Sequence, residues 1–372
     1  PFIPTDDSQI LERLPVSPLD PELRDLQEMR QELSRRPDNL ALASKAAWKY
    51  IEQGRRQSDP RFYGYAQAAL EPWWAQAAAP VPVLLLRATI RQHNHDFESA
   101  LADLSALLQV DPTNAQAYLT RALIQQVRGN YEGAREDCSQ VLQLATPLIA
   151  ATCLTGVGSL TGEAQESEQT LRGALARAPL GDKSARLWAL TVLGEIAVRR
   201  GDAAAAESDF RQALALGLRD DYLLGAYADF LLDTGRPEEV VDLLARSTRS
   251  DALLLRLALA EQAAGTAALS AHVEALQARF MASRLRGEAV HRREEARFTL
   301  HLLKDANSAL RLARENWQVQ HEPSDARILL ESALAAGDPE SARPVLQFLH
   351  QTRLEDVQLA HLENRLTGGA KR

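Results

Sequence analysis

A spacing of 34 residues recurs along the chain, and it constrains the fold more than any other feature of the sequence. Small residues stand 34 positions apart at three places: Ala88 and Ala122, Ala100 and Ala134, and Gly201 and Gly235. Self-similarity at a fixed period of roughly 20–50 residues is typical of stacked supersecondary units. The 372 residues therefore predict one elongated array of small units, and not two or three globular domains.

Within each unit, the order of residues predicts two helices joined by a turn. A small residue in the first helix, such as Ala88, lets the second helix approach closely, and Ala100 faces it from there. Glycine at the turn, as at Gly129, can take a positive φ and end the first helix without a Cβ clash. Proline at the exit, as at Pro112, cannot continue a helix. One such hairpin cannot bury its own apolar face, so neighbouring hairpins must stack on it.

The composition agrees with a helical array and excludes several classes of protein. Hydrophobic residues make up 45% and charged residues 25%, as in ordinary folded chains. Aromatic residues make up only 5%, which disfavours a β-rich fold. A net charge of −8 argues against general binding of nucleic acid or anionic membranes. No apolar run approaches the ~20 residues that a membrane span requires.

On these residues, the chain resembles a tetratricopeptide repeat protein. The family pattern is Trp-x2-Leu-Gly-x2-Tyr, then Ala-x3-Phe, then Pro. One stretch follows it with Leu and Ala in place of two aromatics, at Leu190, Leu193, Gly194, Ala197, Ala206 and Phe210. A second stretch matches at Leu84, Ala88, Phe97, Ala100, Leu104 and Pro112. A single match of this kind is weak, but several in a 34-residue register are a strong signal.

The resemblance implies an all-α fold, a right-handed α-solenoid of stacked helical hairpins over residues 21–366. We expect clear repeats at about 81–114, 115–148, 148–181, 187–220, 221–254 and 323–353. We expect degenerate repeats at about 40–75, 251–286 and 288–322, and a capping helix at 354–366. Residues 1–20, rich in proline and aspartate, are expected to form an extended arm that docks on the solenoid or is disordered. Residues 367–372 are expected to fray.

The resemblance also implies that the first helices line a concave groove, which in this family usually binds a peptide or protein segment. The candidate groove residues are Trp188, Thr191, Glu195, Arg199, Tyr222, Asp229 and Asp233. Trp188 and Tyr222 are equivalent residues in successive repeats, and so are Glu195 and Asp229. An aromatic pair beside an acidic pair suits a segment with apolar and basic side chains. The alternative is that the aromatic residues pack between helices and the acids are solvated.

A well-known subclass of the family clamps the acidic C-termini of heat-shock chaperones with Lys and Asn side chains. The matching positions here are Leu85, Thr89, Leu119 and Leu123. These side chains cannot form charge-assisted hydrogen bonds to a carboxylate. We therefore expect no chaperone-tail carboxylate clamp.

The segment 284–297 departs most from the repeat and is the second candidate contact, through His291, Arg293 and Glu295. This segment and a later acidic loop together contain residue types that bind metals or transfer protons. These are His291 and Glu295 in the segment, and His321, Glu322 and Asp325 in the loop. The favoured alternative is a surface helix whose ion pairs join Glu294 to Arg297 and His291 to Glu295. No complete ligand motif such as His-Glu-x-x-His is present to favour the metal.

The sequence shows no catalytic or cofactor signature. It contains no phosphate-binding loop, nucleophile elbow or Ser-x-x-Lys motif, and Gly156 and Gly158 follow no strand pattern. We expect no enzymatic activity, no cofactor and no bound metal. The predicted function is a non-catalytic scaffold that holds a partner protein or peptide in the groove. The alternatives are a self-associating subunit of an envelope or secretion assembly, and an accessory or enzymatic domain that uses residues 284–297.

The two cysteines bear on the cellular compartment. Cys138 lies in the expected second helix of one repeat and Cys153 in the first helix of the next, and these helices pack together in such arrays. A disulfide and two small buried thiols are equally compatible with this placement. The chain begins at Pro1, which we read as the trace of a removed leader, and its Ala/Leu/Arg-rich composition resembles bacterial proteins. The expected location is periplasmic or secreted, with the cytoplasm as the alternative.

Overall fold

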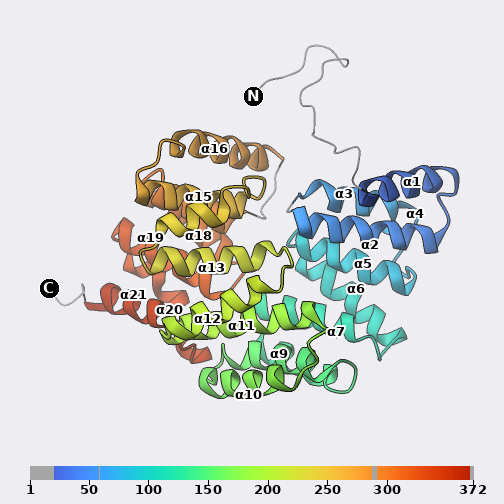
Figure 1. Ribbon diagram of the computed structural model, residues 1–372, viewed down its shortest axis with the longest axis horizontal. Coiled ribbons are helices and arrows are strands. Elements are labelled where there is room, and N and C mark those ends of the chain that lie inside the picture. Colours follow the sequence, from blue (N-terminus) through green and yellow to red (C-terminus); the bar gives the residue numbers. More distant parts are fainter. Residues whose placement is uncertain (1–20, 58, 287–290, 369–372) are drawn as a thin grey trace, which may run out of the picture.

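The computed structural model describes residues 21–57, 59–286 and 291–368, and all regular structure among them is helical (Figure 1). The arm expected at residues 1–20 lies outside the described residues, as do residues 369–372 of the expected tail. Packed pairs of helices follow one another along a curved path from α1 to α16 (Figure 1). The expected fold class, an all-α solenoid of stacked helical hairpins, is confirmed.

The helices fall into three groups along the chain. The first group is α1 (Pro21–Arg35), α2 (Leu40–Gln57), α3 (Arg61–Ala69) and α4 (Glu71–Trp74). Regular hairpins follow, formed by α5 (Val81–His93) and α6 (Phe97–Val110), α7 (Ala115–Val127) and α8 (Tyr131–Val141), α9 (Pro147–Gly158) and α10 (Ala164–Arg177), α11 (Lys183–Arg200) and α12 (Ala203–Ala215), α13 (Asp221–Asp233) and α14 (Pro237–Leu244), and α15 (Asp251–Ala264) and α16 (Leu269–Leu285). The third group, here called the C-terminal segment, is α17 (Arg292–His301), α18 (Ala306–Trp317), α19 (Pro323–Ala336), a 3-10 turn (Pro339–Ala342), α20 (Arg343–Thr352) and α21 (Val357–Gly368).

The turns and helix contacts have the physical basis that the sequence predicts. Gly129, which follows α7, has a φ of 76°, in the left-handed region that glycine adopts without a Cβ clash. Between α5 and α6 the corresponding residue is His95, with a φ of 58°. In α11, a Cβ on Gly194 would lie 2.6 Å from the ring of Phe210 in α12, so only glycine permits this close approach.

Buried ion pairs join the two helices of successive hairpins. Arg87 of α5 binds Asp103 of α6, with Nη2 and Oδ1 2.6 Å apart, and both side chains are buried. The pair recurs 34 residues later, where Arg121 of α7 binds Asp137 of α8 at 2.6 Å. The sequence analysis did not identify these pairs, although their 34-residue spacing is visible in the sequence. Because Asp103 and Asp137 are buried, each needs its arginine partner, which ties the second helix of the hairpin to the first.

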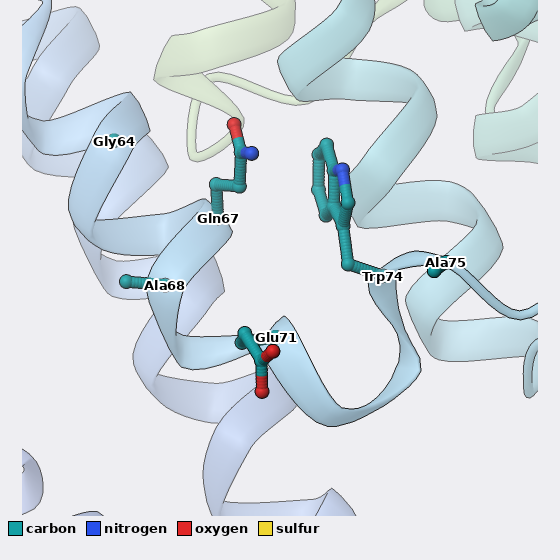
Figure 2. A pocket seen from close by; sticks show the side chains of 6 residues that line it. All are labelled: Gly64, Gln67, Ala68, Glu71, Trp74 and Ala75. Atoms are coloured by element: carbon teal, nitrogen blue, oxygen red, sulfur yellow. The ribbon is translucent and has the colours of Figure 1, made fainter.

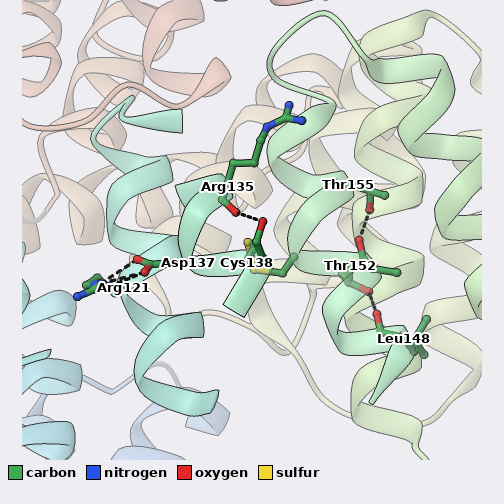
Figure 3. The surroundings of a disulfide bond; sticks show 10 residues. Arg121, Arg135, Asp137, Cys138, Leu148, Thr152 and Thr155 are labelled. Atoms are coloured by element: carbon green, nitrogen blue, oxygen red, sulfur yellow. Dashed lines mark hydrogen bonds and ion pairs between the residues drawn. A yellow bond between two sulfur atoms is a disulfide. The ribbon is translucent and has the colours of Figure 1, made fainter. Parts of the chain in front are cut away.

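A disulfide links two neighbouring hairpins (Figure 3). It joins Cys138 of α8 to Cys153 of α9, whose Cα atoms are 5.5 Å apart. Both cysteines are buried, and the bond spans 15 residues of sequence. In the chain-entropy account, closing a loop of this length contributes about 3 kcal/mol to stability.

The C-terminal segment contacts the turns of hairpins that are far away in the sequence. These are the turns between α5 and α6, α7 and α8, α9 and α10, and α11 and α12, here called the turn edge. Nε2 of Gln320 lies 3.0 Å from Nδ1 of His95 at the first turn. The backbone N–H of His321 donates to the carbonyl of Val127 at the second turn, at 2.7 Å.

The same segment continues along the later turns. The ring of Phe348 covers Gly129 and lies 5.9 Å, centroid to centroid, from Tyr131. A Cβ on Gly162 would meet Arg353 at 3.1 Å, and one on Gly201 would meet Val357 at 3.4 Å. The chain's own C-terminal helices therefore cover the turn edge of four hairpins, a contact that the repeat pattern does not predict.

Candidate binding site

Tyr222 is the centre of the candidate site. It lies in the first turn of α13, and its Oη donates a hydrogen bond of 2.6 Å to Oε1 of Glu195 in α11. The side chain keeps 62% of its surface exposed, and Trp188, the equivalent residue of α11, keeps 37%. Two half-exposed aromatic residues therefore stand on neighbouring first helices, one of them held in place by a carboxylate.

The surroundings of Tyr222 perturb the pKa values of both partners. The negative charge of Glu195 raises the pKa of Tyr222 well above its usual value. Burial also raises the pKa of Glu195, although the nearby Arg199 and the hydrogen bond from Tyr222 act in the opposite direction. Glu322 contributes to both increases. Tyr222 is thus accessible to solvent and yet surrounded by charged groups of the protein.

Residues of the C-terminal segment reach the same place. Nη1 of Arg293 lies 2.6 Å from Oε2 of Glu322, and the charges of both residues act on the hydroxyl of Tyr222. Arg293 also pairs with Glu294 at 3.2 Å and with the fully buried Asp325 at 3.4 Å. The structure therefore brings together parts of two candidate contacts that the sequence placed in separate segments.

The two predicted aspartates of the groove are already neutralised by arginines of the chain. Asp229 lies 2.6 Å from both Arg256 and Arg297. Burial alone would raise the pKa of Asp229, but these two guanidinium groups lower it to about 2. Asp233 pairs with Arg327 at 2.6 Å. The expected equivalence of Glu195 and Asp229 as an acidic pair therefore does not hold.

Two other predicted groove residues are engaged inside the fold. Thr191 is 2% exposed, and its hydroxyl donates to the carbonyl of Leu187 at 2.8 Å, so it does not face a groove. Nη2 of Arg199 donates to Oγ of Ser159 at 2.7 Å, which holds the end of this side chain at the C-terminus of α9. Of the candidate groove residues, Trp188, Glu195 and Tyr222 remain as a group, here called the aromatic–acid site.

The expected surface helix around residue 291 is wrong. His291 precedes α17, and its carbonyl accepts a hydrogen bond from the backbone N–H of Glu295. The side chain of Glu295 is buried and pairs with Arg284 at 2.7 Å, while Arg297 pairs with Asp229. The helix packs against α15, α18 and α19, so its charged residues bind across helices rather than along one surface. Residues 287–290 of this segment lie outside the described residues.

Comparisons with known proteins found similar chains among solved structures. No protein-family model matches the chain, and no curated protein matches it. Among solved structures, the chain is similar to a tetratricopeptide repeat protein from Parabacteroides merdae, with 18% identity and a TM-score of 0.46, covering 64% of this chain and 92% of that one. It is also similar to human IFIT1, crystallised as a dimer with m7Gppp-AAAA, with 13% identity, a TM-score of 0.46, and 89% and 86% of the chains covered. Yeast Tom70 matches at 11% identity and a TM-score of 0.37, over 94% and 95% of the chains.

Stacked helical hairpins whose small residues recur at a spacing of 34, as Ala88 and Ala122 do, decide the architecture. The fold is a tetratricopeptide-like α-solenoid. In this solenoid, the first helices α11 and α13 pack against each other, and Trp188 and Tyr222 occupy equivalent repeat positions on them. Among the residues that the structure describes, no helix is long and apolar enough to cross a membrane.

The tetratricopeptide-like solenoid also carries side-chain contacts that the sequence analysis did not predict. Trp317, His321 and Phe348 form an aromatic cluster, with ring centroids 4.5–5.4 Å apart, that anchors the C-terminal segment beside Tyr131. The hydroxyl of Tyr131 donates to the carbonyl of His321 across 190 residues of sequence. No repeat or motif marks contacts of this kind.

A separate hollow of about 460 Å³ lies on the first repeat of the solenoid (Figure 2). It is lined by Gly64, Gln67, Ala68, Glu71, Trp74 and Ala75. The side chains of Gln67 and Trp74 stand on either side of it (Figure 2). It contains none of the residues predicted for the groove, and its lining is a shallow surface between α3 and α4.

Proposed function

We propose that this chain is a non-catalytic scaffold that binds a segment of a partner protein at the aromatic–acid site. The observation that carries the proposal is the exposure of Tyr222, which keeps 62% of its surface accessible while its hydroxyl is bound by Glu195. Large aromatic residues supply much of the binding energy at protein interfaces. Because the hydrogen bond already orients Tyr222, a partner loses little side-chain entropy when it packs on the ring.

The register of the solenoid supports an extended partner. Trp188 and Tyr222 stand on neighbouring first helices at equivalent positions, so a ligand that contacts both must run across α11 and α13. A polypeptide in extended form spans such a distance with successive side chains. The C-terminal segment contributes Arg293 and Glu322 beside the same site, which gives a partner polar groups as well as an apolar surface.

Alanine substitution of the two aromatic residues tests the proposal. We expect Tyr222→Ala and Trp188→Ala each to weaken capture of the partner from native extract by about tenfold or more, the usual effect of a hot-spot aromatic. Tyr65→Ala is the matched control, because Tyr65 is a 46% exposed tyrosine on the second helix α3. Equal recovery of partner by wild type, Tyr222→Ala and Trp188→Ala would show that the site is not used.

We further propose a periplasmic or secreted location. The bond between Cys138 and Cys153 supports it, because disulfides form and persist mainly in oxidising compartments. We expect protein isolated without reductant and unfolded in denaturant to show no free thiol by titration. Two reactive thiols per chain would instead favour the cytoplasm.

A further inference from the structure

We infer that the partner segment carries a lysine or arginine side chain whose positive charge pairs with Glu195. The inference rests on the proposed function and adds the chemistry of the ligand. It depends on the difference between Glu195 and the other carboxylates around Tyr222.

The other carboxylates already have arginine partners. Asp229 pairs with Arg256 and Arg297, while Glu294 and Glu322 share Arg293. Burial alone would raise the pKa of Glu294, and Arg293 with its neighbours lowers it to about 2. These carboxylates are therefore compensated by charges of the chain itself, and a ligand cation would gain little from them.

Glu195 differs because its partner is a neutral hydroxyl. Tyr222 donates to Oε1, and within the described residues no donor binds Oε2 and no cation lies at ion-pair distance. Arg199 is near enough to act on the pKa of Glu195, but its Nη2 is bound to Ser159. The net effect of the surroundings is a raised pKa of Glu195, which agrees with a carboxylate that lacks a full counter-charge.

Tyr222, which is hydrogen-bonded to Glu195, and Trp188, about two turns before Glu195 on α11, favour a long cationic side chain over other ligands. The aliphatic stem of lysine or arginine packs on an exposed ring while its charged end reaches a carboxylate. Trp188 and Tyr222 offer such rings, 37% and 62% exposed. An acidic ligand would meet the negative charge of Glu195, which has no cation at ion-pair distance in the described part of the chain. A divalent metal would lack ligands, because the described residues contain no group of three or more His, Cys, Asp or Glu that could hold one.

Peptide arrays test the inference directly. The probes are octapeptides whose central residue is fixed as arginine, lysine, glutamate or norleucine and whose flanking positions are varied. We expect the wild type to prefer arginine- and lysine-centred peptides, and Glu195→Gln to bind them about tenfold or more weakly. This change keeps the shape of the side chain and an oxygen that accepts from Tyr222, while it removes the charge. Binding of norleucine-centred peptides should change little.

Three further variants separate the possible outcomes. Glu195→Asp keeps the charge and should retain the preference for basic peptides, and Glu238→Gln, an exposed glutamate of α14, should behave as wild type. Suppose that the wild type binds peptides that Tyr222→Ala does not bind. This inference alone would be overturned if the wild type showed no preference for a basic central residue, or if Glu195→Gln kept that preference unchanged. An array in which no octapeptide is bound would overturn the proposed function as well.

Discussion

Replacing Asp103 by alanine is expected to lower the free energy of unfolding by about 3–5 kcal/mol. Asp103 accepts hydrogen bonds from Arg87 at 2.6 and 2.8 Å and from Arg91 at 2.7 Å, and its side chain is 6% exposed. The substitution leaves the guanidinium of Arg87, itself 4% exposed, buried without its counter-charge. Chemical denaturation followed by far-ultraviolet circular dichroism measures the loss.

An exposed acid on the same helix provides the matched control. Glu98 of α6 pairs with Arg128, but its side chain is 80% exposed, so Glu98→Ala should change the free energy of unfolding by only about 0–1 kcal/mol. If Asp103→Ala and Glu98→Ala destabilised the protein equally, the buried pair would not have the structural role assigned to it.

Acidification is expected to weaken the contact between the C-terminal segment and the turn edge. Burial lowers the pKa of both His93 and His95 from 6.5 to about 4, with the positive charges of His291, Arg293 and Arg55 among the further causes and Glu294 acting in the opposite direction on His95. The pKa of His321 is also lowered by burial and by Arg128. His95 and His321 lie where the first two turns meet the loop between α18 and α19, whereas His93 stacks on the ring of Tyr63 in α3.

The sign of the effect follows from proton binding. Between pH 6.5 and 4, the unfolded chain binds protons at these histidines and the folded chain does not, so stability falls as the pH falls. A shift of the pKa from 6.5 to about 4 corresponds to a loss of free energy of unfolding on the order of 3 kcal/mol for each of His93 and His95. Burial raises the pKa of Asp325 to about 6, and that carboxyl offsets part of the loss because the folded state binds its proton first.

The contribution of His95 can be isolated by substitution. Asparagine tolerates the positive φ of this position, so His95→Asn preserves the turn and removes the titration. We expect this variant to lose about 3 kcal/mol less stability than wild type between pH 7 and pH 4. Identical pH profiles for wild type and His95→Asn would contradict the burial of His95 at this contact.

The hairpins were predictable because their determinants are local and repeated. Ala88, Gly129 and Gly194 show their roles within a single 34-residue unit, and each role recurs in the next unit. The pairing of Arg87 with Asp103 was predictable in the same way, because both residues recur 34 positions later.

The covering of the turn edge was not predictable from the repeat. Tyr131 meets His321 across 190 residues, and Asp229 meets Arg297 across 68, and neither contact follows from a 34-residue period. For the same reason the sequence placed Asp229 beside Glu195 as an equivalent acid. The equivalence fails because Arg256 and Arg297 neutralise only one of the two. The sequence predicted a surface helix at α17 because the helix is rich in charged residues. Their partners in the fold are distant in the sequence, so the pattern did not indicate that these residues pack against other helices.

Photo-crosslinking from the aromatic–acid site tests the central claim most directly. A benzophenone amino acid placed at position 188 keeps an aromatic ring there and leaves the hydrogen bond between Tyr222 and Glu195 intact. The matched probe at position 65 lies on the second helix α3. We predict that position 188 forms an adduct with one extended partner segment containing lysine or arginine, mapped by mass spectrometry, and that position 65 does not. An absence of adducts from position 188, or the same adducts from position 65, would contradict the account.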